Sequence, residues 1–136
     1  RHAALQRWVE DLNRAYRREP ALFTQDFTPA GFEWIDCNDV MQSVITFLRK
    51  GRAGELVLAA CNFTPIPRYH YRAGVPRGGF WEEILNSDAA EYGGSGHGNL
   101  GGLEAAPIPC HGRLHSLDLT LPPLGVVFFK AVSREQ

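Results

Sequence analysis

From residue 32 to residue 132 the chain alternates between short strand-forming segments and short turns, and this alternation constrains the fold more than any other feature. The turns hold glycine or proline, as in 51–54 and 64–67. Short strands at close spacing, with no helical period between them, are typical of an antiparallel β-sandwich. We therefore predict an all-β fold of about eight strands, at residues 32–36, 43–50, 55–62, 68–73, 79–85, 103–108, 113–121 and 125–132.

The alternation within these segments also predicts which side chains face the core. In the segment 114–121 the side chains divide between an inward set, Leu117, Leu119, Leu121 and His115, and an outward set, Ser116, Asp118 and Thr120. The segments 57–60 and 126–129 are almost continuously apolar instead. A strand of that kind is covered on both faces, so we expect these two segments to form central strands.

The first 18 residues have a helical rather than an alternating period. Arg17 and Arg18 lie in the predicted last turn, where positive charge is favourable, and Pro20 ends the helix. The apolar side chains recur at helical spacing and form one wide stripe: Leu5, Trp8, Val9, Leu12, Ala15 and Tyr16. A stripe of this width that includes a tryptophan predicts a helix that packs against a large partner.

Charge and composition exclude several classes of partner. The length of 136 residues suits one domain, and the net charge of -1 gives no basis for binding nucleic acid or an anionic membrane surface. No apolar run is long enough to span a bilayer. Cys37, Cys61 and Cys110 are odd in number and far apart, which argues against a disulfide scaffold and favours reduced thiols in the cytoplasm.

The glycine-rich segment 86–102 predicts an ordered loop between two strands. Within it, residues 96–101 match the dinucleotide-binding pattern G-x-G-x-x-G. That pattern binds phosphate only where a strand precedes it and a helix follows it. Here Pro107 and Pro109 follow after a short apolar segment, and no helix begins. We therefore predict a structural loop and no nucleotide cofactor.

Other residues of the kinds used in catalysis or metal binding occur without a recognisable spacing. Cys110, His111 and His115 lack the second cysteine pair of a zinc site, and we interpret them as residues at a strand end. Glycoside cleavage requires two carboxylates across a cleft, and the positions of the Asp and Glu residues single out no such pair. The sequence therefore predicts no catalytic, cofactor-binding or metal-binding residue in this chain.

Exposed aromatic side chains are the remaining candidates for ligand binding, because their faces can stack on sugar rings. Phe80 and Trp81 are neighbours in a predicted strand, so one of the two faces outward. Tyr92 lies in the glycine-rich segment. Core packing is the common fate of a tryptophan. Three side chains could either stack on a sugar ring or pack in the core: Phe80, Trp81 and Tyr92.

A set of sequence blocks, taken together in order, resembles a known family. Examples are LNRAY at 12–16 and CNFTP at 61–65. The other blocks are 19–22, 31–36, 43–49, 71–76, 86–88, 91–96 and 119–124. Each block alone is weak, but in this order they resemble the C-terminal part of the bacterial 1,4-α-glucan branching enzymes (glycogen branching enzymes) of the α-amylase superfamily. The resemblance extends over nearly the whole chain.

The resemblance implies a division of the chain and a role for each part. Residues 1–20 would be the last helix of a catalytic (β/α)8 barrel, 21–31 a linker and 32–136 the C-terminal β-sandwich. The side chains that would pack on that barrel of the same polypeptide are Leu5, Trp8, Val9, Leu12 and Tyr16. Enzymes of this family cut α-1,4-glucan and transfer the freed segment to a 6-hydroxyl, which makes an α-1,6 branch in glycogen. The implied mechanism is a retaining double displacement by carboxylates of the barrel.

The resemblance thus implies a non-catalytic domain of a branching enzyme, which stabilises the barrel and contacts glucan or glycogen through an exposed aromatic residue. A stand-alone carbohydrate-binding module of a glucan-active enzyme is the alternative, and an unrelated β-sandwich interaction domain is a third interpretation. Away from the barrel, the apolar stripe of residues 1–18 would lose its partner and become exposed, so we expect the isolated chain to self-associate or the helix to fray.

Overall fold

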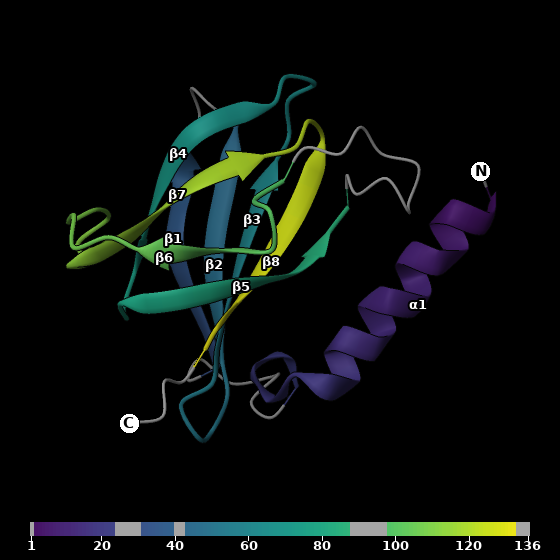
Figure 1. Cartoon of the computed structure of the whole chain (residues 1–136), viewed down its shortest axis with the longest axis horizontal. Coiled ribbons are helices and arrows are strands. Elements are labelled where there is room, and N and C mark those ends of the chain that lie inside the picture. Colours follow the sequence, from purple (N-terminus) through teal and green to yellow (C-terminus); the bar gives the residue numbers. More distant parts are fainter. Residues whose placement is uncertain (1, 24–30, 40–42, 88–97, 133–136) are drawn as a thin grey trace.

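The computed structural model describes residues 2–23, 31–39, 43–87 and 98–132. They form an antiparallel β-sandwich with one long helix beside it (Figure 1). The larger sheet has six strands in the order β1-β2-β3-β8-β5-β6, and β4 pairs with β7 in a second sheet. The helical elements are α1 (His2–Arg18) and the 3-10 turn η1 (Pro20–Leu22). The strands are β1 (Phe32–Asp39), β2 (Val44–Lys50), β3 (Leu56–Asn62), β4 (Arg68–Val75), β5 (Gly79–Asn86), β6 (Gly102–Ala105), β7 (His115–Leu121) and β8 (Gly125–Ala131).

The predicted all-β fold and its preceding helix are confirmed. The two continuously apolar segments lie in β3 and β8, which pair with each other in the middle of the larger sheet as expected. The predicted strand 103–108 is shorter in the structure, because β6 ends at Ala105. Ala106 makes only an isolated bridge to Ser116, and Pro107 has no backbone N–H to continue the pairing.

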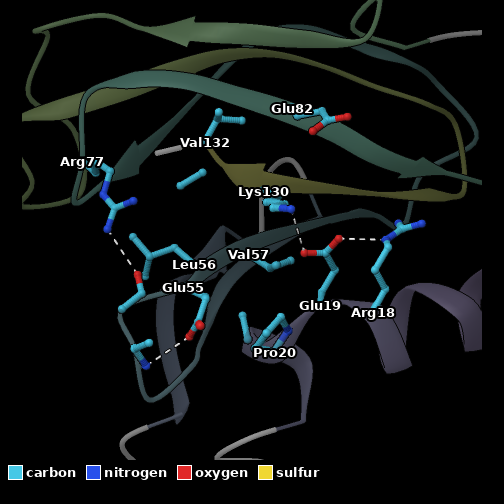
Figure 2. Close-up of a pocket in the computed structure, with 14 residues that line it drawn as sticks. Arg18, Glu19, Pro20, Glu55, Leu56, Val57, Arg77, Glu82, Lys130 and Val132 are labelled. Carbon is cyan, nitrogen blue, oxygen red and sulfur yellow. Dashed lines mark hydrogen bonds and ion pairs between the residues drawn. The ribbon is translucent and has the colours of Figure 1, made fainter. Parts of the chain in front are cut away.

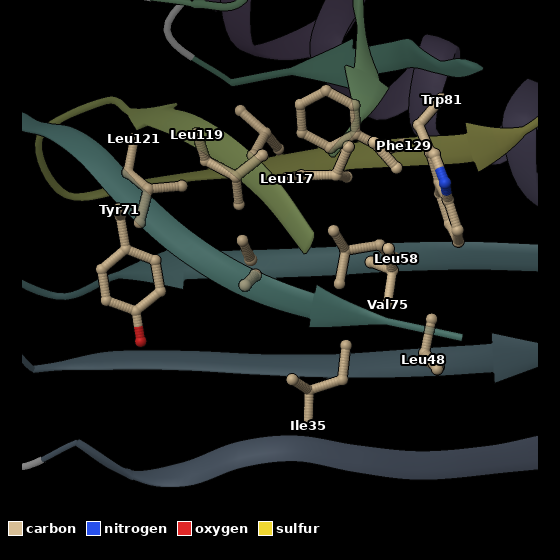
Figure 3. Packing of buried hydrophobic residues seen from close by; sticks show 14 of the residues in the cluster. Ile35, Leu48, Leu58, Tyr71, Val75, Trp81, Leu117, Leu119, Leu121 and Phe129 are labelled. Atoms are coloured by element: carbon tan, nitrogen blue, oxygen red, sulfur yellow. The ribbon is translucent and has the colours of Figure 1, made fainter. Parts of the chain in front are cut away.

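The core lies between the two sheets (Figure 3). The larger sheet contributes the fully buried side chains of Trp81 and Phe129. The smaller sheet contributes the three leucines of β7 that the alternation predicted to face inward, and these are fully buried: Leu117, Leu119 and Leu121. His115, which the alternation also placed on the inward side, is only half-buried. The indole N–H of Trp81 donates to the carbonyl of Arg77 at 3.2 Å, so this large side chain is buried without an unsatisfied polar atom.

One predicted orientation is wrong. The alternation places Ser116 on the solvent side of β7, but its side chain is fully buried. The segment after β6 covers this side of β7, where Ala106 bridges to Ser116. The Ser116 hydroxyl donates to the carbonyl of Ile108 at 2.7 Å and accepts from the Arg72 guanidinium at 2.8 Å. A strand pattern carries no information on a loop that later covers the strand. Asp118 is exposed, as predicted.

α1 lies beside the face of the larger sheet that points away from β4 and β7 (Figure 1). We call this the outer face, and the face toward the core the inner face. Neighbouring residues of a strand point to opposite faces. In β3, for example, Leu58 points into the core and Val57 points to the outer face, where it packs against η1. The junction of α1, η1 and the outer face contains both ion pairs and hydrogen bonds.

Candidate functional site

A polar cavity separates the end of α1 from the outer face (Figure 2). Its volume is about 470 Å³, and it lies where η1 approaches β3, β5 and β8. Charged groups of both signs line it, among them Arg18, Glu19, Glu82 and Lys130. Their charges nearly cancel, so the cavity offers no strong electrostatic attraction for an anion or a cation. Its residues instead connect the helix to the sheet.

Glu19 is the centre of this connection. It is only 3% exposed, although it follows directly after the helix. Its backbone is extended, because Pro20 begins η1 at the next residue, and the carboxylate lies toward the sheet (Figure 2). One carboxylate oxygen lies 3.0 Å from the Arg18 Nε, and the other lies 3.3 Å from the Lys130 Nζ of β8. The carboxylate therefore joins the last residue of the helix to a central strand.

η1 adds an apolar anchor beside this ion pair. Ala21 and Leu22 are buried against Val57. The Arg49 guanidinium of β2 donates to the carbonyl of Leu22 at 3.2 Å and to that of Gly31 at 3.3 Å. The first residues of the predicted linker 21–31 are thus a fixed part of the sheet's outer layer. Residues 24–30 of that linker lie outside the described part of the chain.

The predicted apolar stripe of α1 divides into two edges. Ala15 is fully buried, and Trp8 lines a second cavity together with Cys61 of β3, so this edge faces the domain. Val9 and Tyr16 form the other edge and are exposed. Leu12, between the edges, is half-buried, and the side chain of Leu5 lies outside the described residues. The domain itself therefore covers only part of the stripe.

The two neighbouring aromatic candidates have opposite positions. Trp81 is fully buried in the core, so the prediction that it could contact glucan is wrong: its strand position points inward. Phe80 is 37% exposed and is the outward-facing partner that the alternation required. Its ring lies over Gly102, where an added Cβ would come within 2.4 Å of the ring. Glu104 stands opposite Phe80 on β6. Tyr92 lies outside the described residues.

The remaining candidates have structural surroundings. The His111 Nδ1 accepts from the backbone N–H of Gly74 at 3.0 Å, and the Cys110 thiol lies 3.6 Å from the carbonyl of Arg72. In the described residues, no three His, Cys, Asp or Glu side chains come together as a metal site would require. The described end of the G-x-G-x-x-G segment leads into β6 and not into a helix. Burial raises the pKa of the Cys61 thiol above its ordinary value.

Sequence reasoning missed three polar residues that organise the fold: Glu19, Asn62 and Asn99. Asn99 is buried, and its amide donates to Glu83 at 2.9 Å while its side-chain oxygen accepts from the backbone N–H of Thr120 at 2.7 Å. The available signal for Glu19 was weak, namely an acidic residue directly before a proline and two apolar residues. Nothing in a single sequence distinguishes such residues from solvated ones.

The fold and the junction together define an accessory β-sandwich domain that holds a helix against the outer face of its larger sheet. A family model described as "Alpha amylase, C-terminal all-beta domain" matches residues 34–132. The chain belongs to this family. Within the described residues, no helix has the length and apolar character needed to cross a membrane.

Three similar relatives carry the same name. The chain is 62% identical over 130 residues to the 1,4-alpha-glucan branching enzyme GlgB of Aquifex aeolicus (strain VF5), which covers 95% of this chain and 21% of the relative. It is 61% identical over 127 residues to GlgB of Aromatoleum aromaticum, and this match covers 93% of this chain and 20% of the relative. It is 57% identical over 132 residues to GlgB of Albidiferax ferrireducens, and this match covers 96% of this chain and 21% of the relative. The chain thus spans about a fifth of the length of these curated relatives.

Proposed function

We propose that this chain is the C-terminal domain of a 1,4-α-glucan branching enzyme whose catalytic residues lie in another part of a longer polypeptide. The observation that carries the proposal is the 62% identity over 95% of the chain, in a relative that is about five times longer. The description of the family, a C-terminal all-beta domain, is consistent with this proposal. The glycosyl transfer would be performed by the missing barrel.

The role of the domain would be to hold and stabilise that barrel. Two observations support this role. The exposed edge of α1, with Val9 and Tyr16, is apolar and available to the rest of the polypeptide. The C-terminal end of the same helix is fixed to the sandwich by Glu19 and Lys130. A helix that is shared in this way joins the two bodies into one unit.

A direct contact with glucan is a second, finer part of the proposal. Phe80 is the candidate platform, because its ring is partly exposed and is supported from below by Gly102. The exposed carboxylates of Glu82 and Glu104 lie on the same face of β5 and β6, where they can accept hydrogen bonds from sugar hydroxyls. The stand-alone binding module remains the alternative in which this contact would be the main function.

Cytoplasmic location is also a proposal, and the thiols support it. Cys61 and Cys110 form no disulfide in the described part of the chain. Cysteines that stay reduced are typical of a protein kept in a reducing compartment. Cell fractionation of the source organism, with antibodies against the chain, tests the location directly.

An activity assay separates the main proposal from the alternative. We expect the full-length polypeptide to reduce the iodine stain of amylose, and the isolated chain to leave it unchanged. Branching activity in the isolated chain, or none in the full-length polypeptide, would refute the proposal. This assay tests whether the catalytic residues lie outside the chain, and its result does not depend on whether the sandwich binds glucan.

Native electrophoresis through gels that contain glycogen tests the glucan contact. We expect glycogen to retard the chain, and Phe80→Ala to remove the retardation. Tyr69→Ala is the matched control, since Tyr69 is an exposed aromatic residue on β4, in the other sheet. Retardation that survives Phe80→Ala would remove Phe80 as the platform, and equal mobility with and without glycogen would leave the domain as a scaffold.

A further inference from the structure

One end of the sandwich presents large apolar side chains on an unusually well-fixed backbone. The connections 62–67 (β3 to β4) and 122–125 (β7 to β8) lie side by side there, at the top of the view in Figure 1. Phe63, Ile66 and Leu124 are 59%, 60% and 69% exposed. We call these three side chains and the two connections the apolar tip. Neither connection contains a charged residue.

A single buried amide fixes the backbone of the apolar tip. Asn62 donates to the carbonyl of Ile66 at 3.0 Å and to that of Pro122 at 2.9 Å, so it joins the two connections. Its side-chain oxygen accepts from the Thr64 backbone N–H at 3.0 Å and from the Thr64 hydroxyl at 2.8 Å. All four hydrogen bonds that an asparagine side chain can make in this way are made. The Leu124 N–H adds a further link, to the carbonyl of Thr64 at 2.7 Å.

Such a surface is suited to binding another apolar surface. Ordering a loop normally opposes association, and a backbone that is already fixed avoids that loss. The absence of charge matches the composition of interface cores, which are depleted in charged residues. Leu124 also adopts a left-handed backbone, at a φ of 46°, which is unfavourable for a leucine. Neither the sandwich core nor the Glu19 junction needs these three side chains.

The position of the apolar tip indicates which partner it meets. A cavity of about 330 Å³ connects it to α1, because Trp8, Phe63 and Leu124 all line it. The tip is therefore continuous with the helix that, by the proposed function, packs on the barrel. About four-fifths of the length of the relative from Aquifex aeolicus lies outside this chain, and the corresponding part of the parent polypeptide is the occupant that we assign to the tip.

We propose that the apolar tip is a second docking surface for the rest of the parent polypeptide, in addition to the exposed edge of α1. This inference rests on the proposed function. Docking at both the helix and the tip would fix the orientation of the sandwich, since a single contact along one helix leaves a rotation about that helix free.

Hydroxyl-radical footprinting of the full-length polypeptide and of the isolated chain tests the inference. We expect the oxidation of Phe63 and Leu124 to be about tenfold slower in the full-length polypeptide, as for side chains in an interface core. Leu114 is the internal control, because it is exposed and apolar but lies away from the tip; its rate should be the same in both. Equal rates for Phe63 and Leu124 in both samples would overturn the inference.

Two further outcomes keep the inference distinct from its alternatives. Protection of Phe63 and Leu124 in the isolated chain that is lost on dilution would assign the tip to a second copy and overturn the inference. The full-length polypeptide could also show branching activity and protect Tyr16 while Phe63 stays reactive. That outcome would leave the proposed function intact and overturn only the docking of the apolar tip.

As a second test, we substitute Phe63→Ser together with Leu124→Ser. The double substitution should split the thermal unfolding of the full-length polypeptide into two transitions and leave the unfolding of the isolated chain unchanged. A single unchanged transition in the full-length polypeptide would count against docking.

Discussion

The inner and outer faces of the larger sheet are built from the same strands and are completed in different ways. On the inner face, Leu58 and Phe129 are sealed by the second sheet, which is part of the same chain. On the outer face of the same strands, Val57 and Phe128 belong to a smaller apolar cluster, and Lys130 beside them is charged. The other members of this cluster are Ala21 and Leu22 of η1 and Ile84 of β5. The inner face is a closed apolar core, whereas the outer face combines apolar contact with ion pairs.

This difference shows which part of the domain is self-sufficient. The outer face also carries an aromatic cluster of Phe32, Trp34 and Phe47, with ring centroids 4.9 to 5.9 Å apart, and Trp34 is exposed. A face that is apolar but incompletely covered is a surface for attachment. Mutations on the inner face should therefore affect folding, while those on the outer face should affect the attachment of α1.

We expect the largest difference in stability between substitutions of two adjacent residues that point to opposite faces of the sheet. Trp81→Ala removes a fully buried side chain, and we expect it to lower the free energy of unfolding by about 3–5 kcal/mol. Phe80→Ala, one residue away on the outer face, should lower it by about 1 kcal/mol or less. Urea denaturation of both variants measures the difference, and similar losses would contradict the contrast between the faces.

Next in size is the ion pair of the outer face. Glu19→Ala should lower the free energy of unfolding by about 1–2 kcal/mol. This value is at the low end of the range for a hydrogen bond to a charged group, because the side chains of Arg18 and Lys130 are partly exposed to water. Glu82→Ala is the control on the same cavity, and its exposed carboxylate should change stability by less than about 0.5 kcal/mol. Tryptophan fluorescence, compared with that of a Trp8→Phe variant to isolate the signal of Trp8 in α1, reports whether the helix has come away. An equal response to both substitutions would show that Glu19 does not hold the helix.

A smaller effect of opposite sign is expected on the inner face. The Thr46 hydroxyl is buried and has no hydrogen-bond partner in the described part of the chain. Thr46→Val replaces it with a methyl group of the same shape, so we expect a gain of about 1 kcal/mol. Ser116→Ala serves as the contrast, because its hydroxyl is buried but satisfied and its removal should destabilise the fold. Thermal melting of both variants gives the two signs, and a loss for Thr46→Val would mean that the hydroxyl is satisfied in solution.

The smallest effect is a pH dependence on the outer face. Burial raises the pKa of the Cys61 thiol above its ordinary value of 9.0. The folded state therefore favours the neutral thiol, and its contribution to stability is complete below that ordinary value and is lost as the pH rises toward the folded pKa. One proton limits the slope to about 1.4 kcal/mol per pH unit. Urea denaturation between about pH 8 and pH 10 should show a decline that is weaker in Cys61→Ala; parallel curves would remove Cys61 as its source.

Periodicity predicted most of the fold, and particular residues show where it failed. Alternation is a local property, so it located the strands and the inward leucines of β7 correctly. It also required that one of Phe80 and Trp81 face outward, but it could not say which. Ser116 failed because its environment is created by a loop ten residues earlier in the chain, at Ala106. Burial of polar groups depends on contacts that no local pattern contains.

The sequence by itself determined the approximate strand positions, the central pair of strands and the family, because each of these depends on short runs of neighbouring residues. Only the tertiary structure decided that Glu19 is a buried link to Lys130 and that Asn62 joins two connections into one apolar tip. The physical reason is distance along the chain. Asn62 and Pro122 are 60 residues apart, and Glu19 and Lys130 belong to opposite ends, so their hydrogen bonds and ion pairs exist only after the sheets have brought them together.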